Sequence, residues 1–151
     1  MNIKTILPWV LVIYIAFVFI QSLFFKFAGS QETVIIFNTI GDWMAGIGFL
    51  SAIAEPFKNY GGWVVGITEL IASILLFIPR LRIWGAIIAL ATISGAIFFH
   101  LFTPLGVVRA IDDMGNTDGG VLFFMACGVW VASAITIYLN KDQLTNQRLA
   151  E

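Results

Sequence analysis

Three side chains that can exchange protons or carry charge lie in or at the ends of long apolar stretches: Lys26, Glu69 and His100. Glu69 comes seven residues after Gly62, where its apolar stretch begins. At 1.5 Å per residue in a helix, this places it about 10 Å deep. A carboxylate at that depth in hydrocarbon costs a few kcal/mol, so it must face other helices and be paired or protonated. A carboxyl and an imidazole beside an apolar cavity can exchange protons with a ligand.

The elements that position these residues are predicted to be membrane spans. Of the 151 residues, 60% are hydrophobic and 11% charged, which is too few polar residues to cover a soluble globule and too many apolar ones for a disordered chain. A hydrocarbon core of about 30 Å needs about 20 apolar residues in a helix. The predicted spans are residues 6–26, 62–79, 83–102 and 120–139. We therefore expect an all-α integral membrane four-helix bundle, with residues 1–151 forming one domain.

An additional helical segment is expected at residues 30–58, between the first and second spans. Ser30 can cap a helix that has Glu32 in its first turn. Within the segment, the apolar stretch Trp43–Ala54 is short for a span and favours an amphipathic interfacial or re-entrant helix. A fifth span is the alternative, and it would move all later residues to the opposite side of the membrane.

The distribution of basic residues predicts the orientation. If the N-terminus is cytoplasmic, the cytoplasmic side carries Lys4, Arg80, Arg82, Lys141 and Arg148, and the outer side carries Lys26, Lys58 and Arg109. Because the side with more Lys and Arg stays inside, both termini are predicted to be cytoplasmic.

This topology brings Lys26, Glu69 and His100 from three helices to the outer third of the membrane, with Ser22 one helical turn from Lys26. Two interpretations stay open. One is a structural ion pair between Lys26 and Glu69 that fixes how the helices pack. The other is a polar pocket for the head group of an amphiphile such as a quinone, whose carbonyls need hydrogen bonds and proton exchange.

Small residues mark the predicted packing face of the second span. Gly62, Gly66 and Ser73 share one helical stripe with Glu69. Gly62 and Gly66 form a GxxxG pair, which predicts close approach to another helix backbone.

Several kinds of site are not expected. The single cysteine, Cys127, excludes an internal disulfide, and the net charge of −1 leaves no basic surface for nucleic acid. One histidine cannot form a bis-histidine haem site. No metal-ligand set is predicted, because the acidic stretch 112–118 lacks the spacing of a calcium loop and is typical of a solvated turn.

Over residues 12–101 the chain resembles the DoxX and DoxX-like family of small membrane proteins. The motifs that carry the resemblance are Phe24-Phe25-Lys26-Phe27, Gly66-Ile67-Thr68-Glu69-Leu70, Ile78-Pro79-Arg80 and His100. The resemblance implies a four-helix bundle in the bacterial cytoplasmic membrane. It also implies a link to quinone-coupled sulfur oxidation or oxidative-stress complexes, which some relatives have. The resemblance also selects four residues as candidates for the site: Lys26, Glu69, Arg80 and His100. A thiol–disulfide role is not expected here, because Cys127 has no resolving cysteine.

The leading functional prediction is a membrane subunit that binds a quinone-like amphiphile and supports an oxidoreductase. Glu69 would exchange protons, His100 would donate a hydrogen bond or relay protons, and Lys26 would be an electrostatic partner. The supporting residues would be Ser22, Gly62, Gly66, Ser73 and Arg80. Electrons would come from a membrane-bound or soluble redox partner. The alternatives are a non-enzymatic scaffold or assembly protein and, less favoured, a small transporter, which would need homo-oligomers and lacks inverted repeats.

Overall fold

The computed structural model describes residues 3–143, and this part of the chain is helical apart from its turns and one loop. It contains five helices: α1 (Ile3–Phe27), α2 (Gln31–Ala45), α3 (Ser51–Phe77), α4 (Arg82–Phe102) and α5 (Val121–Leu139). Within the described residues, four helices are long and apolar enough to cross a membrane: α1, α3, α4 and α5. The protein is thus an all-α membrane bundle that crosses the bilayer several times, as predicted.

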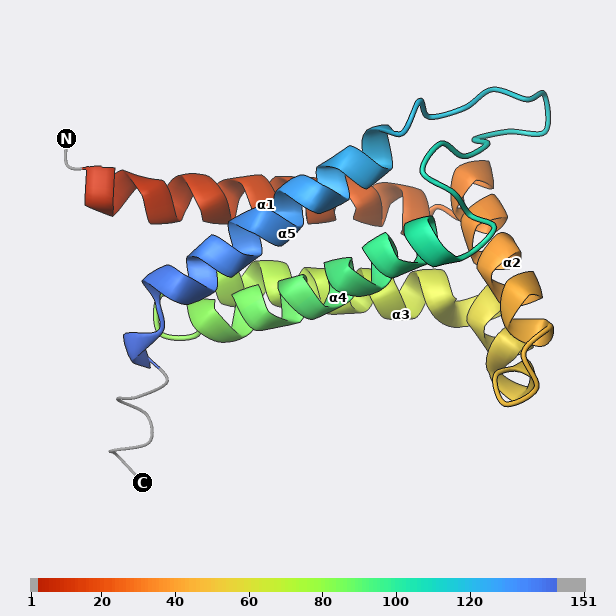
Figure 1. Cartoon of the computed structure of the whole chain (residues 1–151). Helices are drawn as coiled ribbons and strands as arrows, with labels where there is room; N and C mark the ends of the chain where they lie inside the picture. Colours follow the sequence, from red (N-terminus) through yellow and green to blue (C-terminus); the bar gives the residue numbers. More distant parts are fainter. Residues whose placement is uncertain (1–2, 144–151) are drawn as a thin grey trace.

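The four long helices run lengthwise beside one another, and α2 lies across one end of them (Figure 1). In the bundle, α1 packs against α3 and α5, and α4 packs against the same two helices. The loop formed by residues 103–120 is found beside α2. We call this end of the molecule the α2 end. The start of α1 and the end of α5 lie together at the opposite end (Figure 1).

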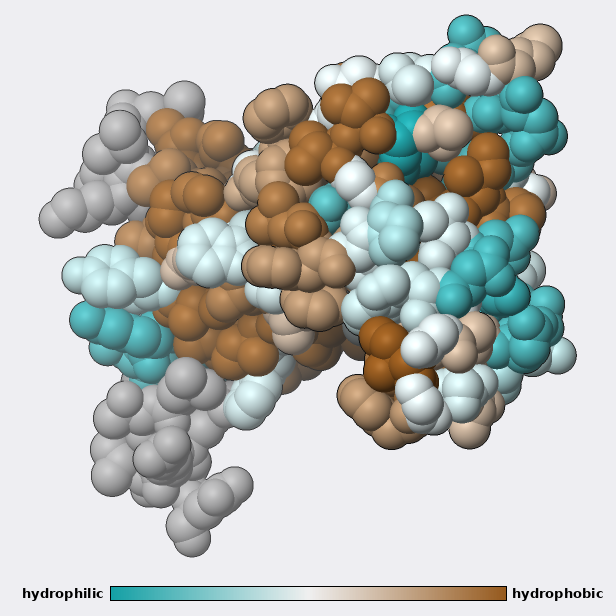
Figure 2. Space-filling view, turned by 45° about the vertical axis from the view of Figure 1, so that its right-hand side comes forward, coloured by the Kyte–Doolittle hydropathy of each residue, from teal (hydrophilic) through white to brown (hydrophobic). Residues whose placement is uncertain are grey.

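The bundle is held together by a core of aliphatic residues and one phenylalanine. All four long helices contribute fully buried side chains to it, including Ile15 and Phe19 of α1, Leu76 of α3, Ala89 of α4 and Val129 of α5. Large apolar side chains also point outward, and the middle of the surface is largely brown in Figure 2, with teal residues gathered at the α2 end. This pattern suits a protein whose middle is in contact with lipid.

The backbones of α3 and α4 approach closely at Gly85 of α4. A Cβ atom at this position would lie 2.7 Å from the amide nitrogen of Leu76 and 2.9 Å from the carbonyl oxygen of Ala72, both on α3. Backbone atoms cannot move aside as a flexible side chain can. The absence of a side chain at Gly85 therefore sets the spacing of α3 and α4.

The predicted close approach at the GxxxG pair is wrong in its detail. The nearest atoms to a Cβ at Gly62 belong to the side chains of Thr33 and Phe37 on α2, and those at Gly66 to Phe27 and Leu23 on α1. The two glycines make room for bulky side chains and not for another backbone. Gly62 lets α3 pack against α2, and Gly66 lets it pack against α1.

The second span begins earlier than predicted, and the apolar stretch Trp43–Ala54 is not a helix of its own. α2 ends at Ala45, residues 46–50 form turns, and α3 begins at Ser51. The reason is local, because Gly46 and Gly48 weaken the helix and the Gly46 N–H bonds to the carbonyls of Trp43 and Met44 as a C-cap. The predicted outer segment 30–58 therefore consists of α2, a turn and the first residues of α3. Arg148, used above for the orientation, lies outside the described residues.

Candidate functional site

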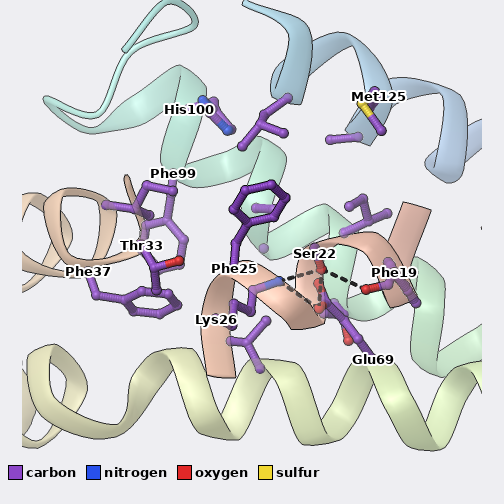
Figure 3. A pocket seen from close by; sticks show the side chains of 18 of the residues that line it. Phe19, Ser22, Phe25, Lys26, Thr33, Phe37, Glu69, Phe99, His100 and Met125 are labelled. Carbon is purple, nitrogen blue, oxygen red and sulfur yellow. Dashed lines mark hydrogen bonds and ion pairs between the residues drawn. The ribbon is translucent and has the colours of Figure 1, made fainter. Parts of the chain in front are cut away.

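A cavity of about 500 Å³ lies inside the bundle at the α2 end (Figure 3). All five helices contribute to its walls, which are mostly aliphatic and aromatic. Its polar lining residues are Gln21, Ser22, Lys26, Glu32, Thr33, Thr68, Glu69, Thr92 and His100. A largely apolar cavity with a few polar groups is the usual form of a site for a small organic ligand.

One wall of the cavity carries a hydrogen-bonded ion pair. The Lys26 ammonium lies 2.6 Å from the Glu69 carboxylate and donates to the Ser22 hydroxyl at 2.9 Å. Ser22 lies 2.8 Å from the same Glu69 oxygen and 2.9 Å from the carbonyl of Phe19. The side chains of Glu69 and Lys26 are only 7% and 16% exposed. We call Ser22, Lys26 and Glu69 the ion-pair cluster.

The helices place this cluster by simple spacing. Ser22 and Lys26 are four residues apart on α1, so they lie on one face of it. Gly66 of α3 admits Phe27 and Leu23, which brings α1 close enough for Lys26 to reach Glu69. The cluster balances the charge of the buried carboxylate, as the depth of Glu69 required.

The ion-pair cluster keeps hydrogen-bonding capacity for a ligand. An ammonium has three N–H donors, and within residues 3–143 Lys26 uses two of them. The second carboxylate oxygen of Glu69, Oε1, accepts no hydrogen bond from these residues either. The charges of Lys26 and Glu69 cancel, so this wall offers a donor and an acceptor without a net charge.

His100 lines a different wall. Its Nδ1 lies 2.6 Å from the carbonyl oxygen of Gly106, and its ring packs edge-on against Phe123. Because a carbonyl can only accept, Nδ1 carries a hydrogen and donates it. The other ring nitrogen, Nε2, has no hydrogen-bonding partner among residues 3–143, although the residue is 8% exposed.

The three predicted site residues therefore share one cavity but do not form one cluster. Lys26 and Glu69 are paired, whereas the described contacts include none between His100 and either of them. In Figure 3, His100 lies on the far side of the cavity from Lys26, with Phe25 between them in that view. Lys26 is near the end of α1 and His100 is near the end of α4, and they face the cavity from different sides.

Among the predicted supporting residues, only Ser22 belongs to the cavity wall. Ser73 is buried and donates to the backbone carbonyl of Glu69, a contact within α3. Gly62 and Gly66 pack against α2 and α1, as described above. Arg80 is exposed in the turn between α3 and α4, at the end opposite the cavity.

Two buried arginines were missed by the sequence reasoning. Arg82 bonds to the carbonyl of Leu76 through Nε and stacks over Trp9, with 4.4 Å between its guanidinium carbon and the ring centroid. Arg109, in the 103–120 loop, is 3% exposed. In the sequence both residues serve only as charges that indicate the orientation, because an arginine at a helix end or in a loop gives no signal of burial.

Arg109 ties the loop to α2. Its guanidinium bonds to Glu32, and the Asp118 carboxylate lies 3.8 Å away. Burial acts to raise the pKa of Asp118, but N–H groups of Arg109, Gly120 and Leu122 and the Arg109 charge hold that pKa below its ordinary value. Since Glu32 lines the cavity, these contacts fix the wall formed by α2.

Some residues that line the cavity have large exposed fractions. They are Phe25 of α1 at 46%, Val64 of α3 at 61% and Val121 of α5 at 56%. These helices have the length and hydropathy of membrane spans. These three residues therefore belong both to the cavity wall and to helices that are candidate membrane spans.

Comparison with protein-family models, with curated proteins and with solved structures finds no match to this chain. The resemblance to the DoxX family stays a prediction from the short motifs that carry it.

Proposed function

We propose that this protein binds a quinone-like amphiphile in the cavity and supports a membrane oxidoreductase. The observation that carries the proposal is a largely apolar cavity of about 500 Å³ with the ion-pair cluster on one wall and His100 on another. Such a cavity accepts a flat apolar ring while its polar groups bind oxygen atoms at the ring edge.

The charge of the site favours an uncharged head group. Lys26 and Glu69 neutralise each other, and Glu32 is paired with Arg109. A ligand with a net charge would bring an unbalanced charge into an apolar environment, which is costly. The third N–H of Lys26 is a donor for a carbonyl or hydroxyl oxygen, and Phe19, Phe25 and Phe99 supply apolar surface for a ring. These features favour a quinone or quinol over an anionic phospholipid.

The exposed lining residues support the bilayer as the source of the ligand. Phe25, Val64 and Val121 line the cavity and have large exposed fractions on candidate membrane spans, which would let a long apolar tail stay in the membrane while the head group is bound. Electrons for the supported reaction would come from a membrane-bound or soluble partner. In the predicted orientation, in a bacterial cytoplasmic membrane, the cavity opens in the outer leaflet.

A binding measurement with a cavity-filling variant tests this function. Ala96→Phe places a ring at a lining position, and Val131→Phe places the same ring on the lipid-facing side of α5. We expect a short-tailed quinone to bind the wild type and Val131→Phe equally in lipid nanodiscs, and to bind Ala96→Phe at least about tenfold more weakly. The proposal is wrong if the quinone does not bind the wild type, or binds all three proteins equally.

A further inference from the structure

We infer that the site prefers a head group that donates a hydrogen bond, the hydroxyl of a quinol, over the acceptor-only carbonyl of a quinone, and that His100 Nε2 makes this choice. The inference rests on the proposed function and adds which redox form of the ligand is bound. It assigns to His100 the role of hydrogen-bond acceptor, in place of the donor or proton-relay role expected from the sequence.

The backbone fixes which nitrogen of His100 carries the hydrogen. Gly106 follows the end of α4 by four residues and has a φ of +71°, a conformation that glycine adopts without strain. The Gly106 carbonyl lies 2.6 Å from Nδ1 and holds the hydrogen there. In a neutral imidazole the other nitrogen is then an acceptor. Nε2 therefore presents a lone pair.

The charged groups near His100 do not supply a partner that would keep a second proton on the ring. Arg109 and Asp118 of the loop both act on it electrostatically, with opposite signs. Arg109 is itself bound to Glu32 of α2 and lies near Asp118. Among the contacts of the described residues, no carboxylate is hydrogen-bonded to the ring. A buried imidazolium without such a partner is unfavourable, so the ring has one proton, on Nδ1.

The consequence follows from the chemistry of the two ligand forms. A quinol hydroxyl donates to Nε2, and its oxygens still accept a hydrogen bond from Lys26 elsewhere in the cavity. A quinone has only acceptor oxygens. A quinone oxygen next to His100 would face the lone pair of Nε2, and the hydrogen bond that this oxygen makes with water would be lost and not replaced. Leaving a buried polar group without a partner reduces affinity by about tenfold or more.

Two substitutions separate the role of Nε2 from the role of Nδ1. In His100→Asn, the side-chain amide can take the place of Nδ1 and keep the bond to Gly106, but nothing replaces Nε2. In His100→Gln, the amide reaches the position of Nε2 and can either donate or accept. Neither change introduces a charge. Far-ultraviolet circular dichroism and the melting temperature check that both variants fold.

The experiment measures binding of one short-tailed ligand as quinol, as quinone and as the quinol dimethyl ether, which keeps the ring but has no O–H group. The protein is held in lipid nanodiscs without oxygen, at a fixed pH above neutrality. We expect the wild type to bind the quinol about tenfold or more tightly than the quinone or the ether. His100→Asn should lose quinol affinity and leave the quinone unchanged, and His100→Gln should gain quinone affinity.

The possible failures are distinguishable. If the wild type binds quinol and quinone equally and His100→Asn changes neither, the preference is overturned while the proposed function stands. If none of the three ligands binds, the proposed function fails and the inference with it. A preference for quinol that persists in His100→Asn would assign the choice to another group and overturn the role of His100.

Discussion

At the scale of single residues, the ion-pair cluster explains how a carboxylate is kept in the apolar part of the bundle. Lys26 and Ser22 both contact the same Glu69 oxygen, and the pair is almost fully buried. Such a pair stabilises the fold little against apolar residues of the same size, but removal of one partner leaves a buried charge uncompensated. We therefore expect a single substitution in the cluster to lower the stability of the fold, and a substitution of both charged partners to lower it much less.

This gives a prediction for stability. Glu69→Gln and Lys26→Met should each lower the free energy of unfolding by about 3–5 kcal/mol. The loss should be nearer the lower figure for Glu69→Gln, because the remaining Lys26 is 16% exposed and can turn toward the interface. The double variant should recover at least half of the loss. Thermal unfolding in mild detergent measures all three, and additive losses in the double variant would contradict the account.

Asp118 gives a prediction for pH. Its pKa is held below 3.8 in the folded protein, so it contributes stability above the unfolded value, and this contribution is lost as the pH falls through the folded value. Asp118→Asn should therefore cost about 1–3 kcal/mol near neutrality, with a loss that shrinks below about pH 3.8. Melting temperatures as a function of pH test this, with the exposed Asp142→Asn as the control. Parallel curves for the wild type and Asp118→Asn would refute it.

At the scale of elements, the packing of α4 on α3 depends on one glycine. Gly85→Ala should destabilise the protein by about 1–3 kcal/mol, because its Cβ meets backbone atoms of α3. Gly95, on the same helix, has no atom of another helix within 4 Å of its Cβ position. Gly95→Ala should leave stability unchanged or raise it by up to about 1 kcal/mol, since alanine is the better helix former. Chemical unfolding of the two variants compares them, and equal effects would contradict this packing.

The elements also show what a sequence can predict here. The four spans follow from length and hydropathy, because a lipid-facing helix must be apolar over about 20 residues. The start of α3 at Ser51 could not be placed, since residues 51–61 are too polar to be read as part of a span. The pairing of Lys26 with Glu69 could be predicted, because a carboxylate at the depth of Glu69 requires a partner. The contact of Arg109 with Glu32 joins positions 77 residues apart, and no pattern in either segment indicates it.

At the scale of the whole molecule, the predicted orientation assigns the α2 end to the outer side of the membrane. Met114, in the 103–120 loop, is 84% exposed, and Asp142, just after α5, is exposed at the opposite end. A membrane-impermeant maleimide should label Met114→Cys in intact cells and Asp142→Cys only after permeabilisation. Cys127, which is partly buried in α5, is replaced by serine in both. The reverse pattern of labelling would place both termini outside.

Identification of what occupies the cavity in the native membrane decides whether this protein binds a quinone or a quinol. The protein is purified in mild detergent, and bound small molecules are extracted and identified by mass spectrometry, with Ala96→Phe and Val131→Phe beside the wild type. We expect a near-stoichiometric quinone or quinol in the wild type and Val131→Phe, and its loss from Ala96→Phe. Only ordinary phospholipid, in equal amounts in all three, would contradict this expectation and leave the ion-pair cluster as a structural tie in a scaffold protein.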